Sequence, residues 1–441
     1  MAEITLPGDF DNYTAIRVVS ELEPFAGPHA PISPTTFAHE SGERVAWREK
    51  IALTENMTIP SRESRWNDIR RRDDGSPVTA PAVLINSIGA EAHQLGRALR
   101  LAPDVEWGRI EIRPWDRARA EQFIDANTKE FFDGVSDPDS LRGAVIDRLT
   151  KTEVDSWEAS HRTADALIRT AEVPDTGKQV WQGGPLKKAL LTADPNVDAT
   201  WLWQNAANDI LFGFWMSNSG TGFRPRWARA VFSEVFGYGV SLVKAGATKT
   251  SPIGEVLNDR GLEELDGALR LTTKAATDST KPSAFGFGQV PGPLGESAVS
   301  CEVILRRGGV SLNHLRQLRV ADDPDRGKAI KIARAAAAAG MYALAVVVSQ
   351  PTFLRSGTDL IPVDSGTVWS AYNREGESVD LTVDVETAHS VLKAALDDLE
   401  AIGLGQADPI CLNMSQLHAE LITRAAVGAA ADGRKTTKRG K

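Results

Sequence analysis

The sequence feature that most constrains the fold is an uninterrupted apolar run of fourteen residues, AAAAAGMYALAVVV, from Ala335 to Val348. A membrane-spanning helix needs about 20 consecutive apolar residues, so this run is too short to cross a bilayer. The cations Lys328, Lys331 and Arg334 precede it. The pattern predicts a buried helix over residues 326–349 in the core of a soluble protein, with no membrane contact.

Strand and helix signals are mixed along the rest of the chain. Residues 83–88 (VLINSI) and 299–306 (VSCEVILR) have the composition of strands, while residues 91–101 show the apolar spacing of a helix. Further helices are predicted around 116–131, 139–150 and 157–172, and hairpins within 238–300. Because the regular strand–helix rhythm of a doubly wound sheet is missing, we predict an α+β fold with insertions.

Turn-forming residues dominate the beginning of the chain, in segments such as PGDF, PFAGPHAPISP and DDGSP. We expect the first 75 residues to form irregular structure and short strands at the edge of a larger body. The segment GAAADGRKTTKRGK, from Gly428 onward, is basic and lacks apolar periodicity, so we predict a disordered tail. The expected organisation is an irregular N-terminal segment (1–80), a core (81–427) and a basic tail (428–441).

Charge and cysteine content exclude several classes of protein. The 441 residues carry 50 basic and 59 acidic side chains, a net charge of −9, which argues against a protein that coats nucleic acid over its whole surface. Two cysteines, Cys301 and Cys411, are too few for a disulfide framework or a zinc knuckle. The N-terminal MAEITLPGDFDNY has no apolar segment of a secretory signal, so we expect a cytoplasmic protein.

Motifs for metal, cofactor or nucleophile chemistry are missing from the sequence. No two of the seven histidines are four residues apart, which excludes the H-E-x-x-H zinc helix. The patterns G-x-x-x-x-G-K-[ST], G-x-S-x-G and G-x-G-x-x-G are also missing. We therefore predict no metal and no cofactor. The segment AFGFGQVPGPLG is weakly similar to the aromatic RNA-stacking motif of small RNA-binding sheets.

A local excess of positive charge lies between Asp209 and Gly254. Its five cations outnumber its two anions by three: Arg224, Arg226, Arg229, Lys244 and Lys249 against Asp209 and Glu234. Lys and Arg gain affinity for a nucleic-acid backbone by displacing its counterions, so this excess favours a phosphate-binding site. A solvated helix face followed by a polar hairpin would give the same pattern, and the spacing does not separate the two interpretations.

Two other charged segments also allow two interpretations. In SWEASHRTADALIR (156–169), His161 and Arg162 are either directed at a phosphate or base, or form a polar cap with a contact between Arg162 and Asp165; spacing alone favours the cap. In SRESRWNDIRRRDDG (61–75), five arginines stand among four carboxylates. We interpret that segment as a solvated, self-neutralising surface.

Taken in order, these segments resemble the backbone subunit of type I-G (formerly I-U) CRISPR effector complexes, the RAMP-superfamily equivalent of the family-seven Cas protein of other Cascade assemblies. The similar blocks are VLINSIGAEAHQLGRAL, SWEASHRTADALIR, ILFGFWMSNSGTGFRPRWARAVFSEVFGYGV, KAGATKTSPIG, AFGFGQVPG, LRRGGVSLNHLRQLRV and LRSGTDLIPV. The resemblance covers about residues 80–425. Two departures are visible: His93 and Gln94 stand where the family often has Asn and Arg, and Pro252 lacks a preceding Arg-Ile-Asp.

This resemblance implies an RNA-recognition-motif-like (ferredoxin-like) core with helical and hairpin insertions, and a role that is not enzymatic. Several copies would stack head to tail along the guide RNA (crRNA) together with other effector subunits. The target DNA strand would be recognised through pairing with the guide. The resemblance implies guide contacts from Asn86, Ser87, His161, Arg162, Arg226, Arg229, Lys249, Thr250, Arg307 and Arg355.

Two other functions are consistent with the same residues. Some RAMP relatives cut RNA, so the alternative within the superfamily is an endoribonuclease that processes guide RNA or cuts target RNA. Its catalytic group would be His161 as general acid or base, or a loop aspartate at the scissile phosphate. The alternative outside it is an unrelated α+β enzyme or scaffold that acts on small molecules. A cleavage assay separates the first alternative from the structural subunit, and co-purifying nucleic acid separates the second.

Overall fold

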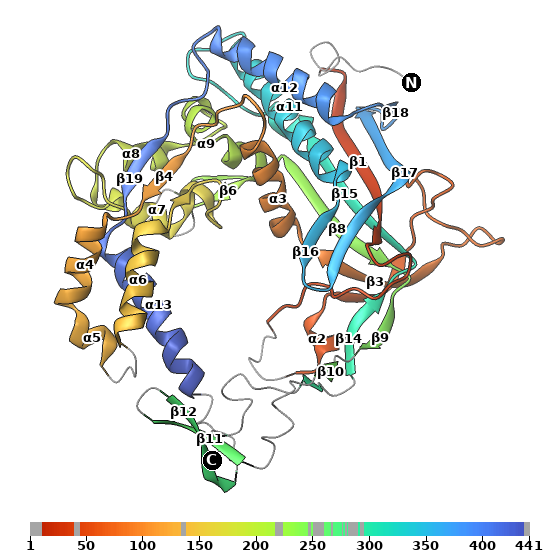
Figure 1. Ribbon diagram of the computed structural model, residues 1–441. Helices are drawn as coiled ribbons and strands as arrows, with labels where there is room; N and C mark the ends of the chain where they lie inside the picture. Colours follow the sequence, from red (N-terminus) through yellow and green to blue (C-terminus); the bar gives the residue numbers. More distant parts are fainter. Residues whose placement is uncertain are drawn as a thin grey trace.

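The computed structural model contains a curled sheet with helices on one side and a second, mostly helical lobe (Figure 1). The sheet order is β16 (Thr352–Arg355), β17 (Thr358–Asn373), β1 (Tyr13–Pro24), β15 (Val303–Ser311), β8 (Val231–Tyr238), β3 (Thr79–Asn86) and β2 (Leu53–Thr58), with β18 (Ser378–Leu381) on β17. All pairs are antiparallel. The predicted α+β class is confirmed. The structure describes residues 11–38, 45–133, 138–216, 224–245, 248–249, 260–265, 268–275, 277, 280, 290–291 and 295–435.

The N-terminal strand β1 lies in the middle of this sheet. It pairs with β15 along one edge and with β17 along the other. The prediction of irregular structure and short edge strands for the first 75 residues is wrong for this twelve-residue strand. Both faces of β1 are covered, so apolar and polar residues do not alternate along it as they do in a strand with one exposed face. Even its polar residues are buried: Ser20 is 0% exposed and Glu21 is 7% exposed.

The long apolar run forms the core helix α11 (Gly327–Ser349), as predicted. With α3 (Ile88–Arg100) it covers one face of the sheet, and α12 (Val385–Glu400) packs against α11 (Figure 1). The approach to the sheet is close, because a Cβ atom on Gly340 would lie 2.6 Å from Val231 Cγ2. By length and composition α11 could cross a membrane, but 83% of its most apolar window is buried inside the protein, as expected of a core helix.

The second lobe has its own small sheet and core. The sheet order is β19 (Ile410–Asn413), β4 (Ile110–Arg113) and β5 (Val154–Asp155). The helices around this core are α4 (Arg117–Ala126), α5 (Thr128–Phe132), α6 (Pro138–Lys151) and α13 (Gln416–Lys435) (Figure 1). The predicted disorder from Gly428 is wrong up to Lys435, where α13 ends, and residues 436–441 lie outside the described part of the chain.

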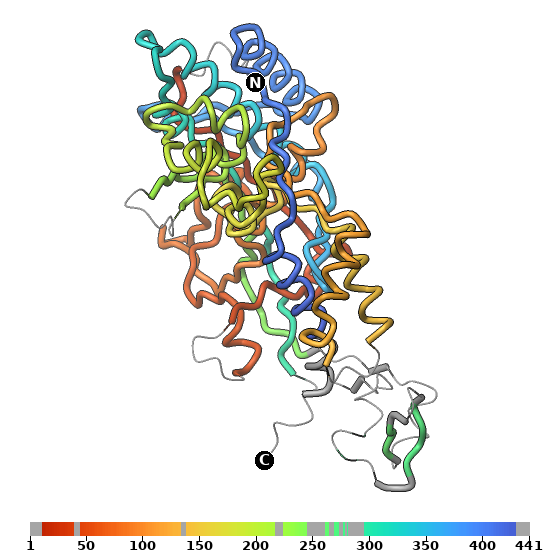
Figure 2. Tube along the Cα trace, turned by 90° about the vertical axis from the view of Figure 1, so that its left-hand side faces the viewer, coloured from red at the N-terminus to blue at the C-terminus, as the bar shows by residue number. Residues whose placement is uncertain are grey.

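Helix α9 (Thr200–Phe212) belongs to the core of the main sheet, where Trp203 and Ile210 are 0% exposed. Part of the 238–300 region forms a hairpin, as predicted, from β11 (Arg260–Leu265) and β12 (Ala268–Ala275). Figure 2 shows an elongated molecule with this hairpin at one end.

Candidate nucleic-acid interface

Helix α3 exposes a row of polar side chains. It begins after Ser87, whose hydroxyl accepts a hydrogen bond from the Ala90 backbone N–H at 3.3 Å, as an N-cap does. One face is buried through Leu95 and Leu99. The opposite face carries side chains spaced by four and by three residues, which places them in a row: His93, Arg97 and Arg100.

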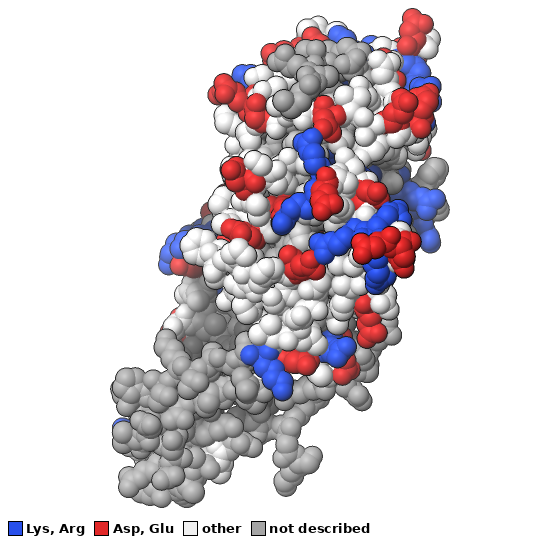
Figure 3. Space-filling view, turned by 90° about the vertical axis from the view of Figure 1, so that its right-hand side faces the viewer, with Lys and Arg blue, Asp and Glu red and all other residues white. Residues whose placement is uncertain are grey.

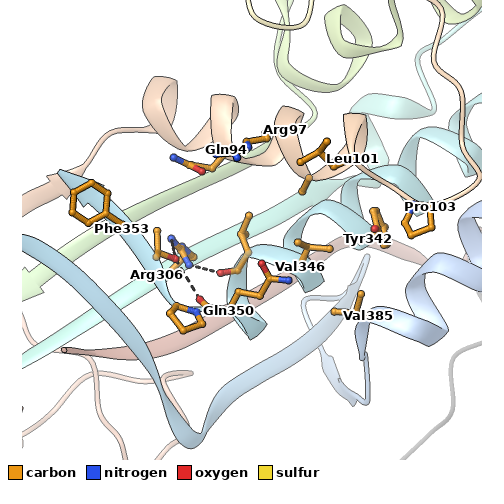
Figure 4. A pocket seen from close by; sticks show the side chains of 14 residues that line it. Gln94, Arg97, Leu101, Pro103, Arg306, Tyr342, Val346, Gln350, Phe353 and Val385 are labelled. Carbon is orange, nitrogen blue, oxygen red and sulfur yellow. Dashed lines mark hydrogen bonds between the residues drawn. The ribbon is translucent and has the colours of Figure 1, made fainter.

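Three adjoining pockets follow this exposed side of α3. One, of about 610 Å³, lies between α3, α11 and β16 (Figure 4). Two others, of about 300 and 450 Å³, continue along the helix to Trp157. Leu101 lines all three. We define the α3 groove as the surface lined by His93, Gln94, Arg97, Arg100, Leu101, Trp157 and Phe353.

Arg97 brings positive charge to the α3 groove. Arg100 is neutralised by ion pairs with Asp155 at 2.8 Å and Glu158 at 2.6 Å. Arg97, by contrast, has no carboxylate oxygen within 4.0 Å among the residues that the structure describes. The apolar side chains of Leu101 and Phe353 are each 67% exposed beside it. Cations next to exposed rings are suited to bind single-stranded nucleic acid.

Arg162 lies in the single turn η1 (Arg162–Ala164) with a left-handed backbone φ of 52°. Its Nη1 donates a 2.9 Å hydrogen bond to the Gly213 carbonyl oxygen, and its guanidinium carbon is 5.5 Å from the centroid of the Phe212 ring. Burial lowers the pKa of Arg162; the charge of Asp209 opposes this shift and the charge of Arg229 adds to it.

The carboxyl group of Asp209 interacts electrostatically with the Arg162 guanidinium. It is 0% exposed and accepts a hydrogen bond from the Thr163 hydroxyl. Burial raises the pKa of the Asp209 carboxyl to about 7, although the hydrogen bond from Thr163 and the charge of Arg162 lower it. Near neutral pH this carboxyl is therefore only partly ionised, which leaves part of the positive charge of Arg162 uncompensated.

Arg162 adjoins the α3 groove through Gly96. A Cβ atom on Gly96 would lie 3.8 Å from Phe212 Cε2 and 3.8 Å from Trp157 Cε3. The Arg162 guanidinium lies over Phe212, and Trp157 lines the groove. The buried rings of Phe212 and Trp157 therefore pack beside Gly96, between Arg162 and the α3 groove.

The arginines of the predicted basic segment lie next to Arg162. From Gly213 the chain enters β6 (Phe214–Trp215), which contacts η1, and it returns through β7 (Arg226–Trp227) to Arg229. Arg226 and Arg229 are exposed, and neither has a carboxylate within 4.0 Å in the described part of the chain. The structure thus brings together four predicted residues: His161, Arg162, Arg226 and Arg229.

His161 and Arg162 stand in a turn, not in the helix predicted over 157–172, of which only η1 and α7 (Ala166–Thr170) form. The His161 side chain is 76% exposed, and its Nδ1 lies 3.3 Å from Asp165 Oδ2. Asp165 in turn caps α7 by accepting from the Leu167 N–H at 2.9 Å. The expected contact between Arg162 and Asp165 is thus replaced by one from His161.

The side chains of Asn86 and Arg355 form hydrogen bonds with other parts of the protein. Asn86 is 4% exposed, and its Nδ2 donates to Glu91 Oε1 at 2.6 Å. Arg355 donates to the Ile85 carbonyl at 2.9 Å and to Asn86 Oδ1 at 3.4 Å, and burial lowers its pKa. Both side chains connect β3 to neighbouring elements, so this geometry gives their predicted RNA contacts no support. Ser87 acts as the cap of α3.

Arg307 lies on the other face of the main sheet. Its neighbour Arg306 faces α3 and α11, so strand alternation turns Arg307 away from them. Its Nη2 donates to Glu234 Oε1 at 2.9 Å. Arg307 is therefore not part of the α3 groove.

Lys249 lies in β10 (Thr248–Lys249), paired with β13 (Val290–Pro291), but its side chain and Thr250 lie outside the described residues.

Carboxylates from other parts of the chain pair with three of the five arginines in segment 61–75, namely Arg62, Arg65 and Arg70. Arg65 pairs with Asp380 at 2.5 Å, and Arg70 with Glu302 at 2.5 Å. On this side of the molecule, Figure 3 shows basic and acidic residues intermixed over the surface. The segment is a solvated surface, as predicted, but its predicted self-neutralisation is wrong: among the described residues, the one ion pair within the segment joins Arg71 and Asp68 at 3.7 Å.

Sequence reasoning missed the cations of α3. The signal was present, because positions 93, 97 and 100 are spaced like one helix face, but our prediction used only the apolar spacing of that helix.

Comparison with known proteins gives a family. A solved structure described as "CRISPR RNA-guided surveillance complex, pre-nicking" is 12% identical, with a TM-score of 0.30, over 95% of this chain and 100% of that chain. At that score a shared overall fold is not demonstrated. No curated protein matches. Residues 16–242, which include most of β1, all of α3 and Arg162, match the family described as CRISPR-associated protein GSU0053, and the chain belongs to this family.

Proposed function

We propose that this protein is the guide-RNA-binding backbone subunit of a type I-G effector complex, which oligomerises along crRNA for RNA-guided recognition of foreign DNA. The observation that carries the proposal is membership of a CRISPR-associated family over residues 16–242. That segment contains α3 and the cluster around Arg162. In this proposal the protein holds RNA and does not cut it.

A ferredoxin-like core of the RAMP kind is part of the proposal. In chain order, β1, α3, β8, β15, α11 and β17 follow the strand–helix–strand–strand–helix–strand order of that motif. The four strands lie side by side as β17-β1-β15-β8, and α3 and α11 contribute to one core. This arrangement supports a core into which the helical lobe and the β11–β12 hairpin are inserted.

The α3 groove, Arg162, Arg226 and Arg229 form the guide-binding surface in this proposal. Cations that contact phosphates position a nucleic acid without reading its sequence, and pairing by the guide reads the target. Arg97, Arg226 and Arg229 have no carboxylate within 4.0 Å among the described residues, so each can contact a phosphate without first losing an ion pair. The net charge of −9 opposes binding to other nucleic acid.

Co-expression of the full chain with its guide tests the function. We expect the purified protein to carry RNA of one defined length. If it carries none and does not bind added guide, the proposed function is wrong.

Salt-dependent binding tests the surface. Arg97→Ala and Arg162→Ala should weaken binding to guides of unrelated sequence about equally. Each should make the slope of log Kd against log salt shallower by about one unit or less. Arg65→Ala is the matched control, because that exposed arginine is paired with Asp380, and its affinity should be unchanged. If wild type, Arg97→Ala and Arg162→Ala bind guide RNA identically at every salt concentration, the proposed guide-binding surface is wrong.

An endoribonuclease is the competing function, and one observation favours it. The exposed His161 ring lies 3.3 Å from Asp165, an arrangement that can orient an imidazole for proton transfer. Incubation of the protein with guide precursor and with target RNA, with and without Mg²⁺, distinguishes the two functions. Our proposal expects intact RNA. RNA cleavage by wild type that disappears in the His161→Ala variant would show that the protein is an endoribonuclease and would overturn our proposal.

A further inference from the structure

The β6–β7 ribbon carries an exposed aromatic ring and a cation on the same face. Trp215 on β6 lies directly opposite Arg226 on β7, so both side chains project from the same face of the ribbon. Trp215 is 61% exposed. Arg226 has no carboxylate within 4.0 Å among the residues that the structure describes. An indole of this exposure contributes little to the hydrophobic core, so stability alone does not explain it.

A second pair of rings, Trp227 and His314, lines the same pocket as Trp215 and Arg226. The rings of Trp227 and His314 are stacked, with centroids 4.1 Å apart and planes inclined by 25°. Each is fixed by the backbone: Trp227 Nε1 donates to the Ile210 carbonyl at 3.1 Å, and His314 Nε2 lies 2.9 Å from the Ala228 carbonyl oxygen. The aromatic wall is therefore already ordered before any ligand arrives.

These residues line an open pocket of about 540 Å³, together with Asn196 and Gln317, whose side chains carry amides. Amide side chains can both donate to and accept from the edge of a nucleobase. A flat ring, a cation and two amides at the rim of one pocket are the groups that recognise an unstacked nucleotide. A purely apolar partner would leave Arg226 and the amides without complementary groups.

We propose that this pocket binds one unpaired base of single-stranded RNA, stacked on Trp215, while Arg226 contacts the adjoining phosphate. The inference rests on the proposed function, in that the RNA is the guide or its flanking sequence. It goes further, because it assigns a contact to a base and not only to the backbone. Every base has a π-face, so this contact tolerates any sequence.

Binding of two probes to the full-length, RNA-free protein tests the inference: oligouridine and an abasic ribose-phosphate oligomer of equal length. The loss of one base–aromatic stack predicts that Trp215→Ala weakens oligouridine binding about 5- to 140-fold. The same variant should bind the abasic oligomer as wild type does, and Trp215→Phe should retain most of the affinity. Phe25→Ala is the matched control, because Phe25 is an aromatic side chain with 72% exposure, and it should change neither affinity.

The outcomes separate this site from the proposed function. If wild type binds oligouridine and Trp215→Ala binds it equally well, the stacking site is wrong and the proposed function stands. An equal loss for both probes would show that Trp215 acts on the backbone or on folding, and would also overturn the site. A change in oligomeric state without a change in oligouridine affinity would identify a protein contact instead. If wild type binds neither probe nor guide RNA, the proposed function fails as well.

Discussion

Loss of the buried ion pair between Glu91 and Arg306 should strongly destabilise the protein. Both side chains are 0% exposed, and Arg306 Nε donates to Glu91 Oε2 at 3.0 Å. The same carboxylate accepts from Asn86 Nδ2 at 2.6 Å and from the Ser233 hydroxyl at 2.7 Å. Replacement of Glu91 by Leu leaves the guanidinium buried without its counter-charge. Removal of one partner of such a pair costs about 3–5 kcal/mol, and we expect Glu91→Leu to lower the free energy of unfolding by that amount.

The double variant tests the cause. In Glu91→Leu combined with Arg306→Met no isolated charge remains, so part of the lost stability should return. Glu234→Leu is the matched control. Glu234 pairs with Arg307, which follows Arg306 on β15. The side chain of Glu234 is 20% exposed and that of Arg307 is 32% exposed. A partly exposed pair of this kind contributes about 0–1 kcal/mol.

Urea unfolding followed by circular dichroism measures all of these variants. The reasoning is refuted if Glu91→Leu costs no more than Glu234→Leu. It is also refuted if the loss of stability in the double variant equals the sum of the losses in Glu91→Leu and Arg306→Met measured separately, because the two charges would then be energetically independent.

Two further predictions concern the Arg162 cluster. Burial raises the pKa of Asp209 from 3.8 to about 7, so the folded protein holds a proton that the unfolded chain releases above about pH 4. The contribution of Asp209 to the free energy of unfolding should therefore fall by about 1.4 kcal/mol per pH unit between about pH 4 and about pH 7, and then level off. Urea titrations of wild type and Asp209→Asn at several pH values measure this contribution. A difference between the two proteins that does not change with pH would contradict the prediction. Gly213→Ala should be more destabilising than Gly177→Ala in thermal unfolding. Both glycines have a positive φ, 78° and 63°. A Cβ atom at 213 would lie 2.8 Å from the Arg229 backbone nitrogen, whereas a Cβ atom at 177 would have nothing within 4 Å. The backbone of Gly213, with φ 78° and ψ 158°, lies in a region that is essentially restricted to glycine, which adds to the loss at 213. Equal losses at the two positions would contradict this prediction.

The parts of the fold that the sequence predicts are those with one dominant local signal. The fourteen-residue apolar run can only be a core helix, and it forms α11. Strand β1 has no such signal, because burial of Ser20 and Glu21 depends on covering segments that lie far away in the chain. The helix predicted over 157–172 is interrupted because Asp165 accepts the Leu167 N–H and starts a new helix.

The candidate site shows the same division. The local excess of charge predicts Arg226 and Arg229, and the family resemblance adds Arg162; the structure brings these three together. The resemblance also implies Arg307, but strand alternation decides that Arg306 faces α3 and Arg307 faces away. The partner of Arg306 is 215 residues distant in the sequence, so no local pattern identifies it.

The central position of β1 has a consequence for synthesis of the chain. Val18 pairs with Gly308 on one side and with Trp369 on the other, so a ribosome must make most of the polypeptide before either neighbour exists. Until then the nascent strand carries two rows of unpaired backbone groups, which can pair with other chains. Closure of the sheet is therefore a late, long-range event, and long-range pairing of this kind is slow. Chains released before Val303 lack both neighbours of β1 and are expected to aggregate, not to fold.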